Sequence, residues 1–209
     1  MDVEWLTSRD LVDYKEAVEF MASRVESIIQ GNAPELVWLL EHASVYTAGT
    51  SASPGDLLLD NKFPVVQTTR GGKYYYHGEG QRVIYVMLNL KQRNQCDVRA
   101  YVRNLGTWVV NTLAEFSVDS FFSDENIGIW VKDKWQDKKI AAFGIRLRQW
   151  VTSHGIAVNI RPNLQHYEGI VPCGIRGAGV TSMRELGIEA TFDQFDEVLR
   201  REFYKVFHC

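Results

Sequence analysis

The sequence has no long apolar run, no basic excess and few cysteines. Its hydrophobic stretches fall short of the roughly 18 residues that suggest a membrane-spanning helix. The formal net charge is −3, whereas a nucleic-acid-binding chain would need a basic excess. Its beginning, MDVEWLTSRD, lacks the charged and then apolar pattern of a secretory signal. These absences predict a cytoplasmic protein with neither a membrane nor a nucleic acid as its partner.

Cysteine occurs only three times, at Cys96, Cys173 and Cys209. An odd number at irregular spacing favours neither a disulfide framework nor a metal cluster. The histidines do not have zinc-ligand spacing either, so no metal is expected. In a reducing compartment the three thiols would be free, and any one of them could take part in chemistry.

The composition that is present is that of a folded domain. The chain has 209 residues, of which 45% are hydrophobic and 23% charged. This length suits one domain with a substantial core and is short for two. Because no repeat, low-complexity segment or linker interrupts it, we expect a single domain over residues 1–209.

Hydrophobic periodicity predicts both helices and strands. Steps of three and four residues predict helices over 11–28, over 98–116 with Asp97 as the N-cap, and over 192–207. Apolar or alternating segments predict strands over 35–41, 65–69, 82–90, 127–131, 139–151 and 154–160. Residues 42–54 and 163–179 are predicted to be loops. The expected fold class is α+β, with a mixed or antiparallel sheet flanked by helices.

Cys173 stands between Pro172, which fixes φ, and Gly174, which frees it. A thiol on such a turn can be presented outward, with backbone amides nearby to bind a developing oxyanion. The pattern also fits a small buried hydrophobic residue, which is what a free cysteine usually is.

Lys139 precedes a strand of small and apolar residues, IAAFG. A partly desolvated lysine could exchange a proton with a thiol or stabilise a thiolate. However, Lys132, Lys134, Lys138 and Lys139 together also fit the charged face of a solvated loop.

His77 lies in a glycine-rich segment, HGEGQ, shortly after Arg70-Gly71-Gly72. Flanking glycines let the backbone approach a ligand, but a structural turn would use the same residues. A phosphate-binding loop is disfavoured, because the glycine order differs and a strand rather than a helix follows. His42 and His154 each fit a satisfied core or surface histidine as well as a site residue.

Four blocks together resemble the octanoyltransferase family (lipoyl(octanoyl) transferase, lipoate-protein ligase B) of lipoate biosynthesis. They are EHASVYTAG at 41–49, RGGKYYYHGEGQ at 70–81, KIAAFG at 139–144 followed by SHGIAVN at 153–159, and IVPCG at 170–174. The chain departs from the family pattern at Ala43-Ser44, which are two prolines there, at Tyr75, a threonine there, and at Glu79, a proline there. The departures at Tyr75 and Glu79 are expected to affect acyl-chain fit and loop rigidity.

The resemblance implies a fold like the catalytic domain of biotin and lipoate protein ligases and an acyltransferase activity without a cofactor. By it, Cys173 takes an octanoyl or lipoyl group from acyl carrier protein as a thioester, and Lys139 lowers the pKa of Cys173 and shuttles protons. The implied acceptors are lysines of lipoyl domains of 2-oxoacid dehydrogenases and of the glycine cleavage H protein. The substrate-binding residues implied are Arg70, Gly71, Gly72, Lys73, Tyr74, Tyr75, Tyr76, His77, Ala142, Phe143, Gly144, Gly155, Ile156 and Ala157, with His42, His154, Gly78 and Gln81 in support.

Three other functions remain open at this point. An ATP-dependent lipoate or biotin ligase shares the fold but would not need Cys173. An inactive module could bind acyl carriers or lipoyl domains, and a cysteine hydrolase would release the free acid. In addition, six basic residues beside the motif blocks predict a basic rim that attracts an acidic carrier protein: Arg70, Lys73, Arg82, Lys138, Arg146 and Arg148.

Overall fold

A mixed eight-stranded sheet is the centre of the computed structural model, which describes residues 3–59, 61–171 and 179–207. The strand order is β1-β2-β6-β10-β9-β8-β7, and β11 pairs with β9. The strands are β1 (Val3–Val12), β2 (Glu35–His42), β6 (Gln81–Met87), β7 (Ser120–Ser123), β8 (Gly128–Val131), β9 (Lys138–Arg148), β10 (Val151–Asn159) and β11 (Gly179–Val180). The β1–β2 and β9–β11 pairs are parallel and the others antiparallel. The predicted α+β class with a mixed sheet is confirmed.

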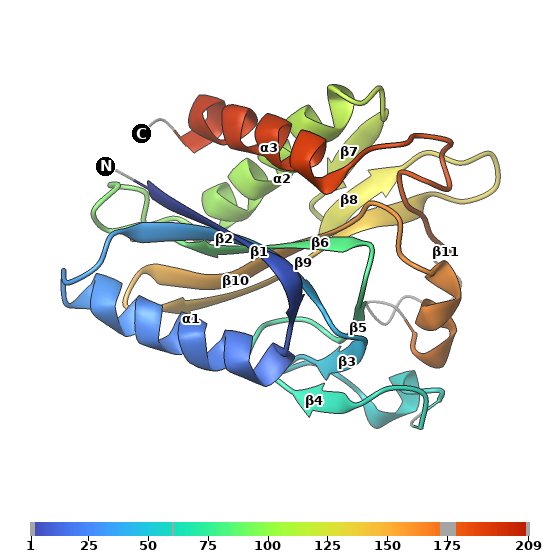
Figure 1. Ribbon diagram of the computed structural model, residues 1–209, viewed down its shortest axis with the longest axis horizontal. Helices are drawn as coiled ribbons and strands as arrows, with labels where there is room; N and C mark the ends of the chain where they lie inside the picture. Colours follow the sequence, from blue (N-terminus) through green and yellow to red (C-terminus); the bar gives the residue numbers. More distant parts are fainter. Residues whose placement is uncertain (1–2, 60, 172–178, 208–209) are drawn as a thin grey trace.

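Helices cover both faces of this sheet (Figure 1). Helix α1 (Tyr14–Ile29) lies on one face, while α2 (Val98–Ala114) and α3 (Phe192–Phe207) lie on the other. The carboxylates of Asp13 and Asp97 accept backbone N–H groups in the first turns of α1 and α2. The predicted Asp97 cap is therefore confirmed, and α3 has the predicted bounds.

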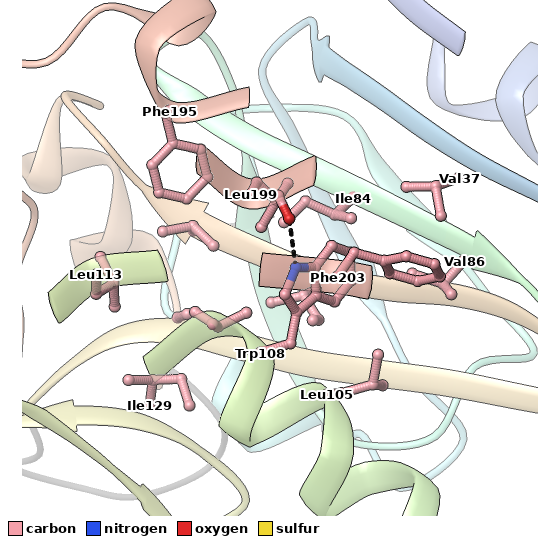
Figure 2. Packing of buried hydrophobic residues seen from close by; sticks show 14 of the residues in the cluster. Val37, Ile84, Val86, Leu105, Trp108, Leu113, Ile129, Phe195, Leu199 and Phe203 are labelled. Carbon is pink, nitrogen blue, oxygen red and sulfur yellow. Dashed lines mark hydrogen bonds between the residues drawn. The ribbon is translucent and has the colours of Figure 1, made fainter. Parts of the chain in front are cut away.

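Trp108 is at the centre of the core between α2, α3 and the sheet (Figure 2). Its ring packs edge-on against Phe203, with centroids 5.1 Å apart. Its indole N–H donates to the carbonyl oxygen of Leu199 at 2.7 Å, which ties α2 to α3. A second cluster on the other face joins α1 to residues of β2, β6 and a smaller sheet.

The smaller sheet has three strands, in the order β4-β3-β5. They are β3 (Val45–Ala48), β4 (Val65–Gln67) and β5 (Tyr74–His77), and short 3-10 helices occur at Pro54–Asp56 and Leu164–Gly169. In Figure 1 this sheet lies below the large one, near the start of α1. Among the described helices, none combines the length and hydropathy needed to cross a bilayer.

Five strands, β1, β3, β5, β7 and β11, were not predicted, and one predicted helix begins too early. Leu11 belongs to β1, and the helix starts only at Tyr14, because Asp13 caps it. Strand β3 lies within the predicted loop over 42–54, and β5 and β7 have only four residues each. Short strands such as these are held by their neighbours in the sheet and show little periodicity of their own.

Candidate active site

A cavity of about 350 Å³ lies between the large sheet and the segment that leads into β5. Strands β6, β9 and β10 contribute one group of lining residues, and residues 70–75 together with His77 contribute another. Its volume falls in the range of small-molecule sites, roughly 300–1,000 Å³. The predicted site residues that line it are Arg70, Gly71, Gly72, Lys73, Tyr74, Tyr75, His77, Lys139, Ala142, Phe143, Gly144, His154, Gly155, Ile156 and Ala157.

Small residues on two neighbouring strands leave room for this cavity. Ala142 of β9 lies beside Ala157 of β10, and Gly144 lies beside Gly155. A Cβ atom added at Gly144 would lie 2.7 Å from the Cδ atom of Arg70, closer than real Cβ contacts allow. The arrangement suits an extended aliphatic chain, whose transfer out of water supplies most of its affinity.

Arg70 holds the Arg-Gly-Gly turn against the cavity. It is buried, and its guanidinium donates to the carbonyl oxygens of Thr47 at 2.9 Å and Gly71 at 3.0 Å. The Gly71 N–H donates to the carbonyl oxygen of Ile145 at 3.2 Å, which fastens the turn to the edge of β9. Gly72 has φ +91°, a left-handed conformation that favours glycine.

Lys139 is only 4% exposed, whereas Lys132 and Lys134 in the same charged segment are exposed. Its Nζ donates to the carbonyl oxygen of Ile127 at 3.1 Å and lies 4.7 Å from the centre of the Trp130 ring. Removing an ammonium group from water costs free energy. A lysine buried at a cavity therefore indicates a function that offsets this cost. Burial favours the functional interpretation of Lys139 over that of a solvated loop, and its catalytic role stays a prediction.

The predicted nucleophile Cys173 lies outside the described residues, as do Pro172 and Gly174. The described chain ends at Val171, whose N–H donates to the carbonyl oxygen of Asp56 at 2.8 Å, and it resumes at Gly179. Gly179 pairs with Lys138, next to Lys139. The assignment of Cys173 as nucleophile therefore stays a prediction.

His42 and His154 are buried and uncharged at neutral pH, because burial lowers the pKa of each to about 4. The Nδ1 atom of His42 lies 2.8 Å from the carbonyl oxygen of Val12, so it carries the proton and donates. Its Nε2 atom therefore accepts from the hydroxyl of Tyr85 at 2.7 Å. His42 does not line the cavity, but it fixes Tyr85, which does.

His77 is oriented by a polar network beneath the cavity. The amide nitrogen of Gln81 donates to the Asn159 side chain at 3.1 Å and to the Tyr167 hydroxyl at 2.9 Å. The amide oxygen of Gln81 then accepts from Nδ1 of His77 at 2.7 Å, so Nε2 carries no proton. Burial lowers the pKa of His77 well below its usual value. The Tyr167 hydroxyl also lies 3.2 Å from that of Tyr75.

Several cavity residues were not predicted from the sequence. They are Tyr14, Val83, Tyr85, Val102, Glu125, Asn126, Ile127 and Ile145. Tyr14 begins α1, and Tyr85 lies in a fully buried strand, so both fit ordinary packing positions. Their place at the cavity follows from the tertiary fold and has no local signal in the sequence.

Tyr76 and Glu79 lie at a separate polar groove, which is also lined by Ser44, Arg161 and His166. Side chains alternate along β5, so Tyr76 points away from the wall that Tyr75 and His77 form. Its hydroxyl lies 2.7 Å from Nδ1 of His166. Tyr76 and Glu79 are therefore not brought to the cavity. Among the supporting residues, Gly78, Gln81 and His42 also lie outside its lining.

The predicted basic rim does not form as expected. Arg70 and Arg82 are buried, and the Nε atom of Arg82 lies 3.0 Å from the carboxylate of Asp196 of α3. Lys138 pairs with Asp133 at 2.9 Å. The prediction of a rim built from all six residues is therefore wrong, because several of these side chains are buried or paired with a carboxylate.

Known proteins resemble this chain in both sequence and fold. A family model described as the lipoyl protein ligase A/B catalytic domain matches residues 13–204. A relative from Anaplasma phagocytophilum (strain HZ), called octanoyltransferase, is 67% identical over 99% of this chain and 100% of its own length. Another of that name, from Ehrlichia chaffeensis, is 56% identical over 98% of this chain and 96% of its own length.

The chain belongs to the octanoyltransferase family. It is an enzyme of the acyltransferase class, as the names of these relatives indicate.

Solved structures support the fold. A bipartite lipoate protein ligase from Thermoplasma acidophilum, in a study of it and its E2 lipoyl domain, gives a TM-score of 0.73 at 14% identity, covering 100% of this chain and 84% of its own. Biotin protein ligase from Aquifex aeolicus gives 0.57 at 12% identity, covering 99% of this chain and 69% of its own.

Proposed function

We propose that this octanoyltransferase-family chain moves an octanoyl or lipoyl group from acyl carrier protein to a lysine of a lipoyl domain, through a thioester on Cys173. The observation that carries the proposal is the buried Lys139 at an apolar cavity made by small residues. Family membership supports the acyl group and the acyltransferase class. The acceptors would be lipoyl domains of 2-oxoacid dehydrogenases and the glycine cleavage H protein.

In the first half-reaction Lys139 takes the proton of the Cys173 thiol, and the thiolate attacks the thioester carbonyl. A new C–S bond forms, the bond to the carrier sulfur breaks, and the Lys139 ammonium returns a proton to that sulfur. Such covalent catalysis divides one transfer into two easier ones. Because a thioester is exchanged for another thioester, this step is nearly balanced in free energy.

In the second half-reaction the neutral amine of the acceptor lysine attacks the acyl-Cys173 carbonyl. The C–N bond forms, the C–S bond breaks, and the proton of the amine passes to Lys139, which again faces the Cys173 thiolate. Amide formation from a thioester is downhill, so ATP is not required. The proposal places the reaction in the cytoplasm, where thiols stay reduced.

Intact-protein mass spectrometry tests the covalent step. We expect wild type mixed with octanoyl carrier protein to gain one octanoyl group, and Cys173→Ser to gain none. Cys96→Ser is the matched control, because Cys96 is an exposed free cysteine, and it should be acylated like wild type. Lys139→Gln should acylate at least a hundredfold more slowly, since general acid–base catalysis contributes roughly 10²–10⁴-fold.

Other results of these acylation experiments would identify one of the three alternative functions. Lysine modification that requires ATP and survives in Cys173→Ser would identify a ligase. Release of free octanoate with an unmodified lipoyl domain would identify a hydrolase. Binding of carrier protein without any adduct or product would identify an inactive binding module.

A further inference from the structure

An exposed tryptophan stands at the tip of the hairpin that joins β8 to β9. Trp135 is 85% exposed, while Leu58, the next of the exposed large hydrophobic residues in the described part of the chain, is 55% exposed. Tryptophan is among the residues most enriched at binding hot spots. In Figure 1 this hairpin projects to the right of β8, away from the body of the sheet.

Two exposed lysines precede this ring in the hairpin, and Lys132 lies over the ring of Phe121 of β7, with its Nζ 5.8 Å from the ring centre. Lys132 and Lys134 are exposed, and neither pairs with a carboxylate in the described ranges. Asp133 is neutralised by Lys138 at 2.9 Å. The Nζ atom of Lys134 lies 4.9 Å from the centre of the Trp135 ring. In a chain of net charge −3, residues 132–138 (KDKWQDK) carry three lysines and two aspartates. The hairpin is thus locally basic beside an exposed apolar ring, which is complementary to an acidic surface.

The tip also lies outside the cavity, because none of residues 132–138 lines it. Trp135 precedes Lys139 by four residues, so the two lie at most roughly 13 Å apart along the chain. An acceptor lysine has only a four-carbon stem to reach the reaction centre, so its domain must approach the cavity itself. A carrier protein presents its thioester on a long prosthetic arm, and it can be held at the tip while the arm enters the cavity.

We propose that the hairpin of residues 132–138 is the docking surface for the acidic carrier protein that delivers the acyl thioester. This inference rests on the proposed function. Trp135 inserts into an apolar spot on the carrier, and Lys132 and Lys134 attract the acidic groups around it. The hairpin continues directly into β9 and Lys139, so a carrier bound there is placed beside the cavity.

The test compares two donors that yield the same acyl-enzyme: octanoyl carrier protein and the small thioester octanoyl-pantetheine. For Trp135→Ala we expect KM for the carrier donor to rise at least tenfold, and kcat/KM for the small donor to stay within twofold. The Lys132→Glu and Lys134→Glu double variant should show the same division and a weaker dependence on ionic strength. The matched controls are Leu11→Ala, 49% exposed on β1 at the far edge of the sheet, and Lys15→Glu, both expected to behave like wild type.

The outcomes separate this proposal from the proposed function. Unchanged carrier kinetics in both hairpin variants would overturn the docking surface while the covalent mechanism stands. An equal loss with both donors would also overturn it, because the hairpin would then act on the cavity. A raised KM for the lipoyl domain alone would assign the surface to the acceptor and refute the proposal. If wild type forms no adduct with either donor, the proposed function itself fails.

Discussion

Gly144 keeps the space between Arg70 and the sheet open, because an added Cβ would lie 2.7 Å from the Cδ atom of Arg70. Valine at this position would displace Arg70 or enter the acyl path. We expect Gly144→Val to lower kcat/KM for acyl transfer at least tenfold, measured as the rate of adduct formation. Gly55→Ala is the control, because nothing lies within 4 Å of its added Cβ. A Gly144→Val variant with the wild-type rate would show that the chain does not pass this residue.

The buried histidines predict loss of stability in mild acid. Burial lowers the pKa of His42 and of His154 from 6.5 to about 4, so below pH 6.5 the unfolded chain binds protons before the folded one. Asp196 acts in the opposite sense, because burial raises its pKa to about 6 and the folded state then binds a proton first. Between pH 7 and pH 5 the net loss in unfolding free energy should be about 2–4 kcal/mol.

Urea denaturation at the two pH values measures this difference. The double variant His42→Asn and His154→Asn should lose much of the pH dependence, with His77, whose pKa burial also lowers, keeping the rest. A wild-type protein equally stable at pH 5 and pH 7 would contradict the burial argument.

At the residue scale, the sequence predicted the parts of the site that lie in contiguous blocks. Residues 70–75, His77 and the small residues of β9 and β10 do meet at one cavity. Tyr14 and Tyr85 were missed, because each occupies an apolar position of a regular element. Tyr76 was predicted in the same block but does not line the cavity, because alternation along the strand separates it from Tyr75.

At the scale of the elements, α2 depends on its N-terminal cap. The carboxylate of Asp97 accepts the N–H groups of Arg99 at 2.9 Å and Ala100 at 3.0 Å. Asp97→Ala leaves both donors without this partner and should lower the unfolding free energy by about 1 kcal/mol. Asp97→Asn keeps an oxygen acceptor and serves as the control, with a loss of only a few tenths. Equal stability of all three proteins in urea denaturation would exclude the cap as a stabilising contact.

Elements with strong periodicity were predicted well, and those that depend on neighbours were not. Helix α3 has the predicted bounds, because its apolar residues repeat at helical spacing. Strand β1 mixes exposed and half-buried positions, and its register with β2 shifts between Thr7 and Leu11. It forms at the sheet edge because β2 offers it a parallel partner, which no local pattern in β1 encodes.

At the scale of the whole molecule, the two faces of the large sheet carry different hydrophobic clusters. The cluster on the α1 face contains Ala142, Ala157 and Tyr75, which also line the cavity. The cluster on the α2 and α3 face contains Trp108 and Phe203. Because neither Trp108 nor Phe203 lines the cavity, substitutions at these positions should alter stability before they alter catalysis.

Trp108→Phe tests this division. The change removes the N–H that donates to the carbonyl oxygen of Leu199 at 2.7 Å, and it leaves that buried acceptor without its partner. We expect the unfolding free energy to fall by about 1–3 kcal/mol, with acylation per folded molecule within twofold of wild type. Trp135→Phe is the matched control, since its exposed ring should change stability by less than about 0.5 kcal/mol. A slower acylation rate with unchanged stability in Trp108→Phe would mean instead that the α2 and α3 face sets the geometry of the cavity through the sheet.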